Sequence, residues 1–124
     1  MDQKAYRALS AAVIQRAVGD VESAYGKVKR WASMEKTGKL ERYVAERQAA
    51  ADSDPDALRL SGDELSALVF FRTSSPIKEL HYGMIDMDPD IIPRRLRTMI
   101  EFVEDNHEKY KRRIAWYKGQ TTRT

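Results

Sequence analysis

Two long stretches, one near each end of the chain, carry apolar residues at intervals of three and four positions. An α-helix turns once in about 3.6 residues, so this spacing places the apolar side chains of each stretch on one face. No segment of the chain alternates apolar and polar residues over the length of a strand, so the sequence predicts an all-α fold. The first stripe is Tyr6, Leu9, Val13, Ala17, Val21, Ala24, Val28 and Trp31, and the second is Ile92, Leu96, Met99, Val103, His107, Tyr110, Ile114 and Tyr117.

The two stripes predict long helices at the ends of the chain. The first helix is expected to stop at residues 37–38, Thr-Gly, since glycine commonly follows the last turn of a helix. The last helix is expected to begin near Ile91 and to stop at residues 118–119, Lys-Gly. Residues 119–124 are then a frayed tail, and residues 1–118 form a single all-helical domain.

Three shorter helices are predicted between the long ones, which makes about five in all. One covers residues 39–51, which are rich in strong helix formers, and another begins at Ser75, where proline follows as the first helical residue. The third begins at Ser61, which forms a capping box with Glu64. Its inner face is expected to be Leu65, Leu68, Val69 and either Phe70 or Phe71.

The composition fits a folded intracellular protein. The chain has 124 residues, of which 42% are hydrophobic and 33% charged, so it has enough apolar residues for one core. It contains no cysteine and therefore no disulfide framework. Its longest apolar run, residues 67–71, is far shorter than the roughly 20 residues of a membrane-spanning helix. We expect a cytoplasmic protein that does not act on a membrane.

Charge is distributed unevenly along the chain. Residues 1–38 carry 7 basic and 4 acidic side chains, residues 39–88 carry 6 and 10, and residues 89–124 carry 9 and 5. The ends are therefore +3 and +4, and the middle is −4. Basic termini suit an anionic partner, although the acidic and basic segments can also neutralise each other within one chain or across a dimer.

Motifs for catalysis or metal binding are weak. The chain has two histidines, His81 and His107, and lacks a zinc-protease motif, a glycine-rich phosphate loop and a serine nucleophile elbow. Four aspartates match positions of a calcium-binding loop, but alanine replaces its central glycine, and a solvated linker is the better interpretation. These aspartates are Asp52, Asp54, Asp56 and Asp63. We therefore assign no catalytic, cofactor-binding or metal-binding residue, and expect no enzyme.

Residues 75–104 have the layout of a helix-turn-helix motif. A short helix from Ser75 and a helix from near Ile91 flank an Asp-Pro corner, and in this motif the start of the second helix enters the major groove of DNA. Arginine can bond guanine or phosphate in a bidentate manner. The same arginines can instead form ordinary surface pairs with acidic residues four positions away. The candidate DNA-binding residues are Ser75, Lys78, Arg94, Arg95, Arg97 and Thr98, with Lys109, Arg112 and Arg113 as additional phosphate contacts.

The segment from residue 63 to residue 100, DELSALVFFRTSSPIKELHYGMIDMDPDIIPRRLRTMI, resembles small phage and prophage proteins described as helix-turn-helix regulators. It departs from their pattern at Asp86, where a glycine commonly turns the corner. The resemblance implies a regulator that binds double-stranded DNA, or a phage adaptor. The alternative is a non-enzymatic protein-interaction module that uses its long helices to bind a polymerase, a virion component or a second copy of itself.

Overall fold

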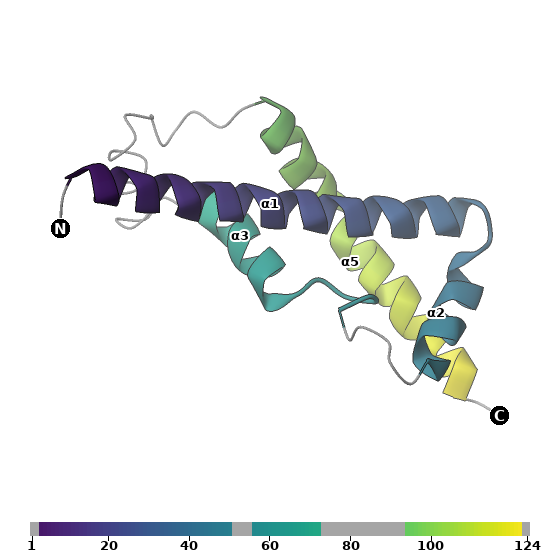
Figure 1. The fold of residues 1–124 in the computed structure, drawn as a ribbon. Coiled ribbons are helices and arrows are strands. Elements are labelled where there is room, and N and C mark those ends of the chain that lie inside the picture. The colour runs from purple at the N-terminus through teal and green to yellow at the C-terminus, as the bar shows by residue number, and fades with distance from the viewer. Residues whose placement is uncertain (1–2, 51–55, 73–93, 123–124) are drawn as a thin grey trace.

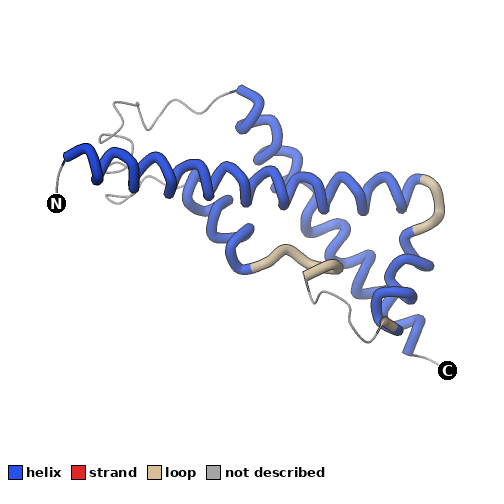
Figure 2. Tube along the Cα trace, viewed as in Figure 1, coloured by secondary structure: helices blue, strands red, loops and turns tan. Residues whose placement is uncertain are grey.

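The computed structural model describes residues 3–50, 56–72 and 94–122, and the regular secondary structure in these ranges is helical throughout (Figures 1 and 2). The predicted all-α fold is therefore confirmed. The described ranges hold four helices rather than the five expected, and the helix predicted to begin at Ser75 lies outside them. The helices are α1, Gln3–Lys36; α2, Leu40–Ala49; α3, Gly62–Arg72; and α5, Arg94–Thr122.

Helix α1 contacts each of the other three described helices. In Figure 1, α5 crosses α1, α3 packs beside α1 nearer its N-terminal end, and α2 folds back from the end of α1 to meet the C-terminal part of α5. The N-terminal end of α1 and the C-terminal end of α5 lie at opposite ends of the molecule. Among the described helices, none is both long and apolar enough to cross a membrane. The largest fully buried side chains are Trp31, Phe71, Leu40, Ile114, Val21, Val28, Val44 and Val103.

The corner between α1 and α2 forms where the sequence predicted a stop. Gly38 has a φ of +73°, a left-handed conformation that only glycine adopts without strain. The amide of Lys39 donates to the carbonyl of Met34 at 2.7 Å, and the amide of Gly38 donates to the carbonyl of Glu35 at 3.2 Å. These two bonds form a Schellman motif, which satisfies carbonyls left free by the last turn of the helix.

The stripe on α1 is confirmed over its second half and wrong at Tyr6 and Leu9, while Ala17 is partly buried and packs against the core. Val21, Ala24, Val28 and Trp31 are all at most 1% exposed, whereas Tyr6 and Leu9 are 46% and 50% exposed. Toward the N-terminus the buried positions are instead Ser10 and Ile14. The buried residues follow alternating steps of four and three, so the small Ser10 occupies the seam in place of the larger Leu9.

The stripe on α5 is confirmed at Leu96, Met99, Val103, Tyr110, Ile114 and Tyr117, which are all buried. His107 is half-buried, and Ile92 lies outside the described residues. The helix runs through Gly119 to Thr122, so the predicted end at residues 118–119 is wrong. A single glycine inside a helix costs only about 1 kcal/mol, which the helical residues on both sides of Gly119 tolerate.

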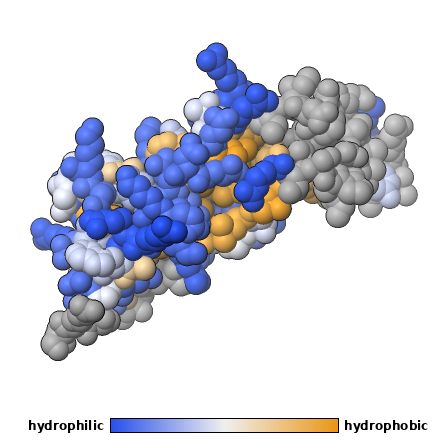
Figure 3. Space-filling view, turned by 180° about the vertical axis from the view of Figure 1, so that it is seen from behind, coloured by the Kyte–Doolittle hydropathy of each residue, from blue (hydrophilic) through white to orange (hydrophobic). Residues whose placement is uncertain are grey.

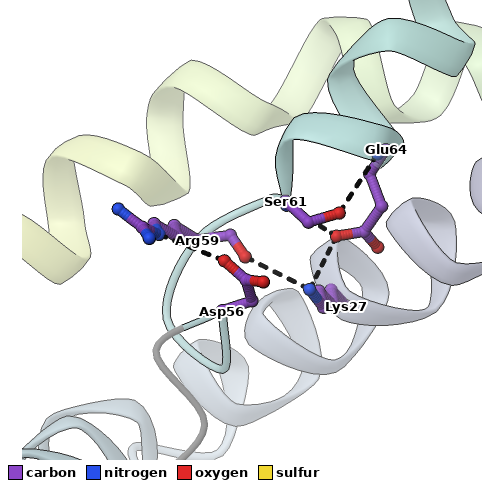
Figure 4. A network of polar contacts seen from close by, with 5 residues as sticks. All are labelled: Lys27, Asp56, Arg59, Ser61 and Glu64. Carbon is purple, nitrogen blue, oxygen red and sulfur yellow. Dashed lines mark hydrogen bonds and ion pairs between the residues drawn. The ribbon is translucent and has the colours of Figure 1, made fainter.

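The start of α3 is fixed by the predicted capping box and by a lysine of α1 (Figure 4). The amide of Glu64 donates to the hydroxyl of Ser61 at 3.1 Å, and the amide of Ser61 donates to Oε1 of Glu64 at 2.7 Å. Nζ of Lys27 lies 2.6 Å from the same Oε1 and also donates to the carbonyl of Arg59 at 3.3 Å. The capping box thus joins α3 to α1.

The inner face of α3 differs from the one expected. Leu68 and Phe71 are buried as predicted, but Leu65 and Val69 are 42% and 46% exposed. Glu64 is only 2% exposed and takes a place on the buried face.

Seen from behind, apolar side chains gather in the middle of the molecule, and hydrophilic side chains cover much of the remaining described surface (Figure 3).

Candidate nucleic-acid interface

The first turn of α5 presents three arginines to solvent. Arg94, Arg95 and Arg97 are exposed, while Leu96 between them is 4% exposed and faces the core. No ion pair involves any of the three within the described part of the chain, so the surface pair of Arg97 with Glu101, four residues on, is not formed there. Among the described residues, the three guanidinium groups are therefore exposed and form no ion pair.

Thr98 lies one turn after Arg94, and its hydroxyl donates to the carbonyl of Arg94 at 2.9 Å. This bond occupies the hydroxyl proton, so only the oxygen of Thr98 remains to accept a hydrogen bond from a ligand. The structure thus brings four of the predicted residues to one end of α5. Ser75 and Lys78, which were predicted to contact phosphates, lie outside the described residues, as does the Asp-Pro corner.

An open groove of about 810 Å³ runs between this end of α5 and the middle of α1. Lys29 of α1 is exposed, and its Nζ lies 5.4 Å from the centre of the Tyr25 ring. That ring in turn packs edge-on against Phe102 of α5, with ring centres 5.3 Å apart. The residues lining the groove are Glu22, Tyr25 and Lys29 of α1 and Arg94, Arg95, Thr98 and Met99 of α5.

The second predicted basic segment is separate from the first. Lys109 and Arg112 are exposed, but Lys109 lies 15 residues after Arg94, which is about 22 Å along a helix. Four exposed acidic side chains lie between the two basic segments and would repel a phosphate backbone that followed the helix. These are Glu101, Glu104, Asp105 and Glu108. The helix therefore does not offer one continuous basic surface.

Arg113 is held by internal contacts. Its Nη2 lies 2.9 Å from Oε1 of Glu35 and 2.7 Å from the hydroxyl of Tyr117, which itself donates to the Glu35 carboxylate at 3.1 Å. The hydrogen bond to Glu35 raises the pKa of Arg113, and burial together with the same carboxylate raises the pKa of Tyr117. The side chain ties α5 to the end of α1, and the prediction that Arg113 contacts DNA loses its support.

The aspartates of the calcium-loop pattern have other partners where they are described. Asp56 accepts a hydrogen bond from Nε of Arg59 at 3.2 Å, and Asp63 lies 3.6 Å from Arg16 of α1. Across the described ranges, no group of three or more histidine, cysteine, aspartate or glutamate residues is placed to hold a metal ion. Asp52 and Asp54 are outside those ranges.

A second groove, of about 360 Å³, lies between α3 and α5. The exposed Leu65 and Val69 supply its apolar wall, and Lys111 and Glu108 of α5 lie at its edge. His107 also lines it, and burial lowers the pKa of this imidazole despite the opposing effect of Glu108. Sequence patterns placed both leucine and valine in the core and so did not predict this surface.

Sequence reasoning also missed the α1 side of the first groove. Glu22, Tyr25 and Lys29 recur at steps of three and four, which places them together on one face of a helix beside the buried stripe. That spacing was the available signal, but nothing local to it indicates that α5 crosses there. Comparisons with protein-family models, with curated proteins and with solved structures found no match to this chain.

Proposed function

We propose that this protein binds duplex DNA through the first turns of α5. The observation that supports the proposal is the group formed by Arg94, Arg95 and Arg97, which are exposed and have no ion-pair partner among the described residues. Arginine guanidinium groups form hydrogen bonds both to phosphate oxygens and to the base edges exposed in the grooves of DNA. Together with the resemblance of residues 63–100 to phage helix-turn-helix proteins, this favours a cytoplasmic transcriptional regulator.

The test is binding of fluorescent duplex DNA, followed by anisotropy at several salt concentrations. Each phosphate contact contributes about 0.9 to the slope of log affinity against log salt, equivalent to about fivefold in affinity at ~0.15 M salt. The double variant Arg94→Ala/Arg97→Ala should therefore lose about 25-fold in affinity and about 1.8 in slope, if both side chains contact phosphate. If they contact bases instead, sequence preference selected from a random duplex pool should weaken with a smaller change in slope.

Arg30→Ala/Lys36→Ala is the matched control. It removes two exposed cations from α1, away from the first turn of α5, and has the same net charge as the double arginine variant. Equal losses in the two variants would indicate a non-specific charge effect and contradict the assigned surface. Absence of wild-type binding even at low salt would refute the DNA-binding proposal altogether.

A second candidate function, self-association as an interaction module, is favoured by the groove between α3 and α5. Leu65 and Val69 are exposed and lie four residues apart, so they form one apolar strip. Lys111 and Glu108 at the edge have no ion-pair partner among the described residues. Under two-fold symmetry, Lys111 of one copy would meet Glu108 of the other, and the two apolar strips would cover each other.

Light scattering during size-exclusion chromatography tests this second candidate. Val69→Asp should convert a wild-type dimer to a monomer, because it buries a carboxylate in the apolar contact. Leu9→Asp, at a similarly exposed position of α1, should leave the dimer intact. A wild-type protein that is monomeric at high concentration would exclude a second copy as the occupant of this groove.

A further inference from the structure

We infer that Lys29 of α1 completes a phosphate-binding groove with Arg94 and Arg95, so that bound DNA lies across the α1–α5 crossing and not on α5 alone. This inference rests on the proposed function and identifies which part of the ligand this groove takes. Its basis is the groove itself, which brings cations from two helices that lie 65 residues apart in sequence, Lys29 and Arg94, to one surface.

The position of Lys29 is defined by aromatic contacts. Phe102 of α5 holds the Tyr25 ring edge-on at 5.3 Å, and the ammonium of Lys29 lies 5.4 Å from the centre of that ring. An exposed cation–π contact is worth only about 0.5–1 kcal/mol, so it orients the ammonium without preventing it from binding an anion. Lys29 has no ion-pair partner among the residues described.

The residues of the groove are those that bind a backbone phosphate. Arg94 and Arg95 offer planar, bidentate donors, and Lys29 adds a point charge from the opposite wall. Arg97 does not line the groove. Lys29, Arg94 and Arg95 would therefore bind a phosphate in the groove, and Arg97 would make a different contact with the DNA.

Glu22 allows a test in which a substitution is expected to strengthen DNA binding instead of weakening it. It is exposed, lines the same groove and lies seven residues before Lys29, which places both on one face of α1. A carboxylate there repels a bound phosphate. If a phosphate occupies the groove, neutralising Glu22 should strengthen binding, and a variant that misfolds would not show a gain in affinity.

The experiment compares Lys29→Ala, Glu22→Gln and the control Arg30→Ala in the anisotropy assay with duplex DNA. Arg30 is exposed on the same helix, next to Lys29 but outside the groove, so its removal changes net charge equally. Lys29→Ala should lower affinity about fivefold at ~0.15 M salt and reduce the salt slope by about 0.9. Arg30→Ala should change affinity less than about twofold, and Glu22→Gln should raise it about twofold, as through-space effects at screened distances.

The outcomes separate this inference from the proposed function. If the wild type binds DNA but Lys29→Ala behaves like Arg30→Ala, the groove inference is overturned and DNA binding by α5 stands. A Glu22→Gln variant that binds no more tightly than wild type also counts against the groove. If the wild type does not bind duplex DNA, both fail together. Matching circular dichroism spectra and melting temperatures confirm that the variants are folded.

Discussion

The contact between Lys27 and Glu64 offers a sharp test of how α3 is held on α1. Glu64 is 2% exposed, and Oε1 of its carboxylate lies 2.6 Å from Nζ of Lys27 and 2.7 Å from the amide of Ser61 (Figure 4). The other oxygen, Oε2, is buried and has no hydrogen-bond partner among the described residues. Lys27 is therefore the cation that balances the charge of Glu64. The informative change is Lys27→Met, which keeps an unbranched apolar stem of nearly the same length and removes the ammonium.

The size of the effect follows from burial. Removing one partner of a fully buried ion pair typically costs about 3–5 kcal/mol, because the other charge remains without compensation. The side chain of Lys27 is 23% exposed, and Glu64 keeps its bond from Ser61, so water and the amide compensate in part. We expect Lys27→Met to cost about 3 kcal/mol, the lower end of that range.

The reverse change should cost less. Glu64→Gln keeps an acceptor for the Ser61 amide, and the ammonium of Lys27 can turn to water, so we expect a loss of about 1 kcal/mol, that of an ordinary hydrogen bond. The double variant Lys27→Met/Glu64→Gln should be more stable than Lys27→Met alone, since it leaves no buried charge. Urea unfolding followed by circular dichroism measures all three, provided that the slope with urea is unchanged.

The pH dependence gives an independent check on the same contact. Burial alone raises the pKa of Glu64, but the hydrogen bonds from Lys27, Ser61 and Ser23, together with the charge of Lys27, outweigh it and lower the pKa below its ordinary value of 4.5. The stability that this group contributes is therefore present above pH 4.5 and is lost as the pH falls through the lower pKa of the folded state. The difference between wild type and Lys27→Met should shrink over that window. A cost below about 1 kcal/mol, or losses that simply add in the double variant, would refute the reasoning.

Four further substitutions test other parts of the structure. Gly38→Ala should lower the free energy of unfolding by about 1 kcal/mol, because φ at this position is +73°. Gly26→Ala lies inside α1 with nothing within 4 Å of the added Cβ, so it should raise the free energy of unfolding by up to about 1 kcal/mol. Urea unfolding measures both changes. Burial lowers the pKa of His107 below 6.5, so the imidazole of the unfolded chain takes up a proton first, and the free energy of unfolding should fall as the pH drops below 6.5. In His107→Gln, urea titrations should show a weaker dependence of this free energy on pH. An unchanged dependence on pH would contradict the prediction. Tyr117→Phe removes the hydroxyl that donates to Glu35 and should cost about 1 kcal/mol, seen as a lower melting temperature, while equal melting temperatures would show that the bond is not formed.

Sequence patterns that involve only residues close together in the chain predicted the helix ends and the class of fold well. The Thr-Gly stop after α1 and the capping box at Ser61 are each decided within six residues, and the structure shows both. The stripe on α5 was also correct, because a helix of 29 residues with a repeated apolar face has one favourable way to turn that face inward. Periodicity and capping were enough to establish the class of fold and most of the core.

The errors arose where a distant charged residue decided which face is buried. On α3, apolar residues occur on two faces, and the sequence pattern predicted that Leu65 and Val69 face inward. In the structure Lys27, which is 37 residues away in sequence, binds Glu64 and turns it inward, so Leu65 and Val69 face solvent. Arg113, which was predicted to contact DNA, likewise has a distant acidic partner, Glu35, 78 residues away in sequence.

The packing of the core determines which way the residues of the candidate interface point. Leu96 is 4% exposed, and Met99 is 6% exposed one turn later, so the seam with α1 fixes the rotation of the first turns of α5. With Leu96 turned inward, the flanking Arg94, Arg95 and Arg97 must fan out over the remaining circumference, and the first two face the groove that contains Lys29. The apolar stripe that predicted the helix therefore also determines which arginines reach α1 and which one remains outside the groove. The proposed DNA binding and core packing should consequently respond together to changes at Leu96, but separately to changes at Lys29, whose exposed ammonium contributes little to folding.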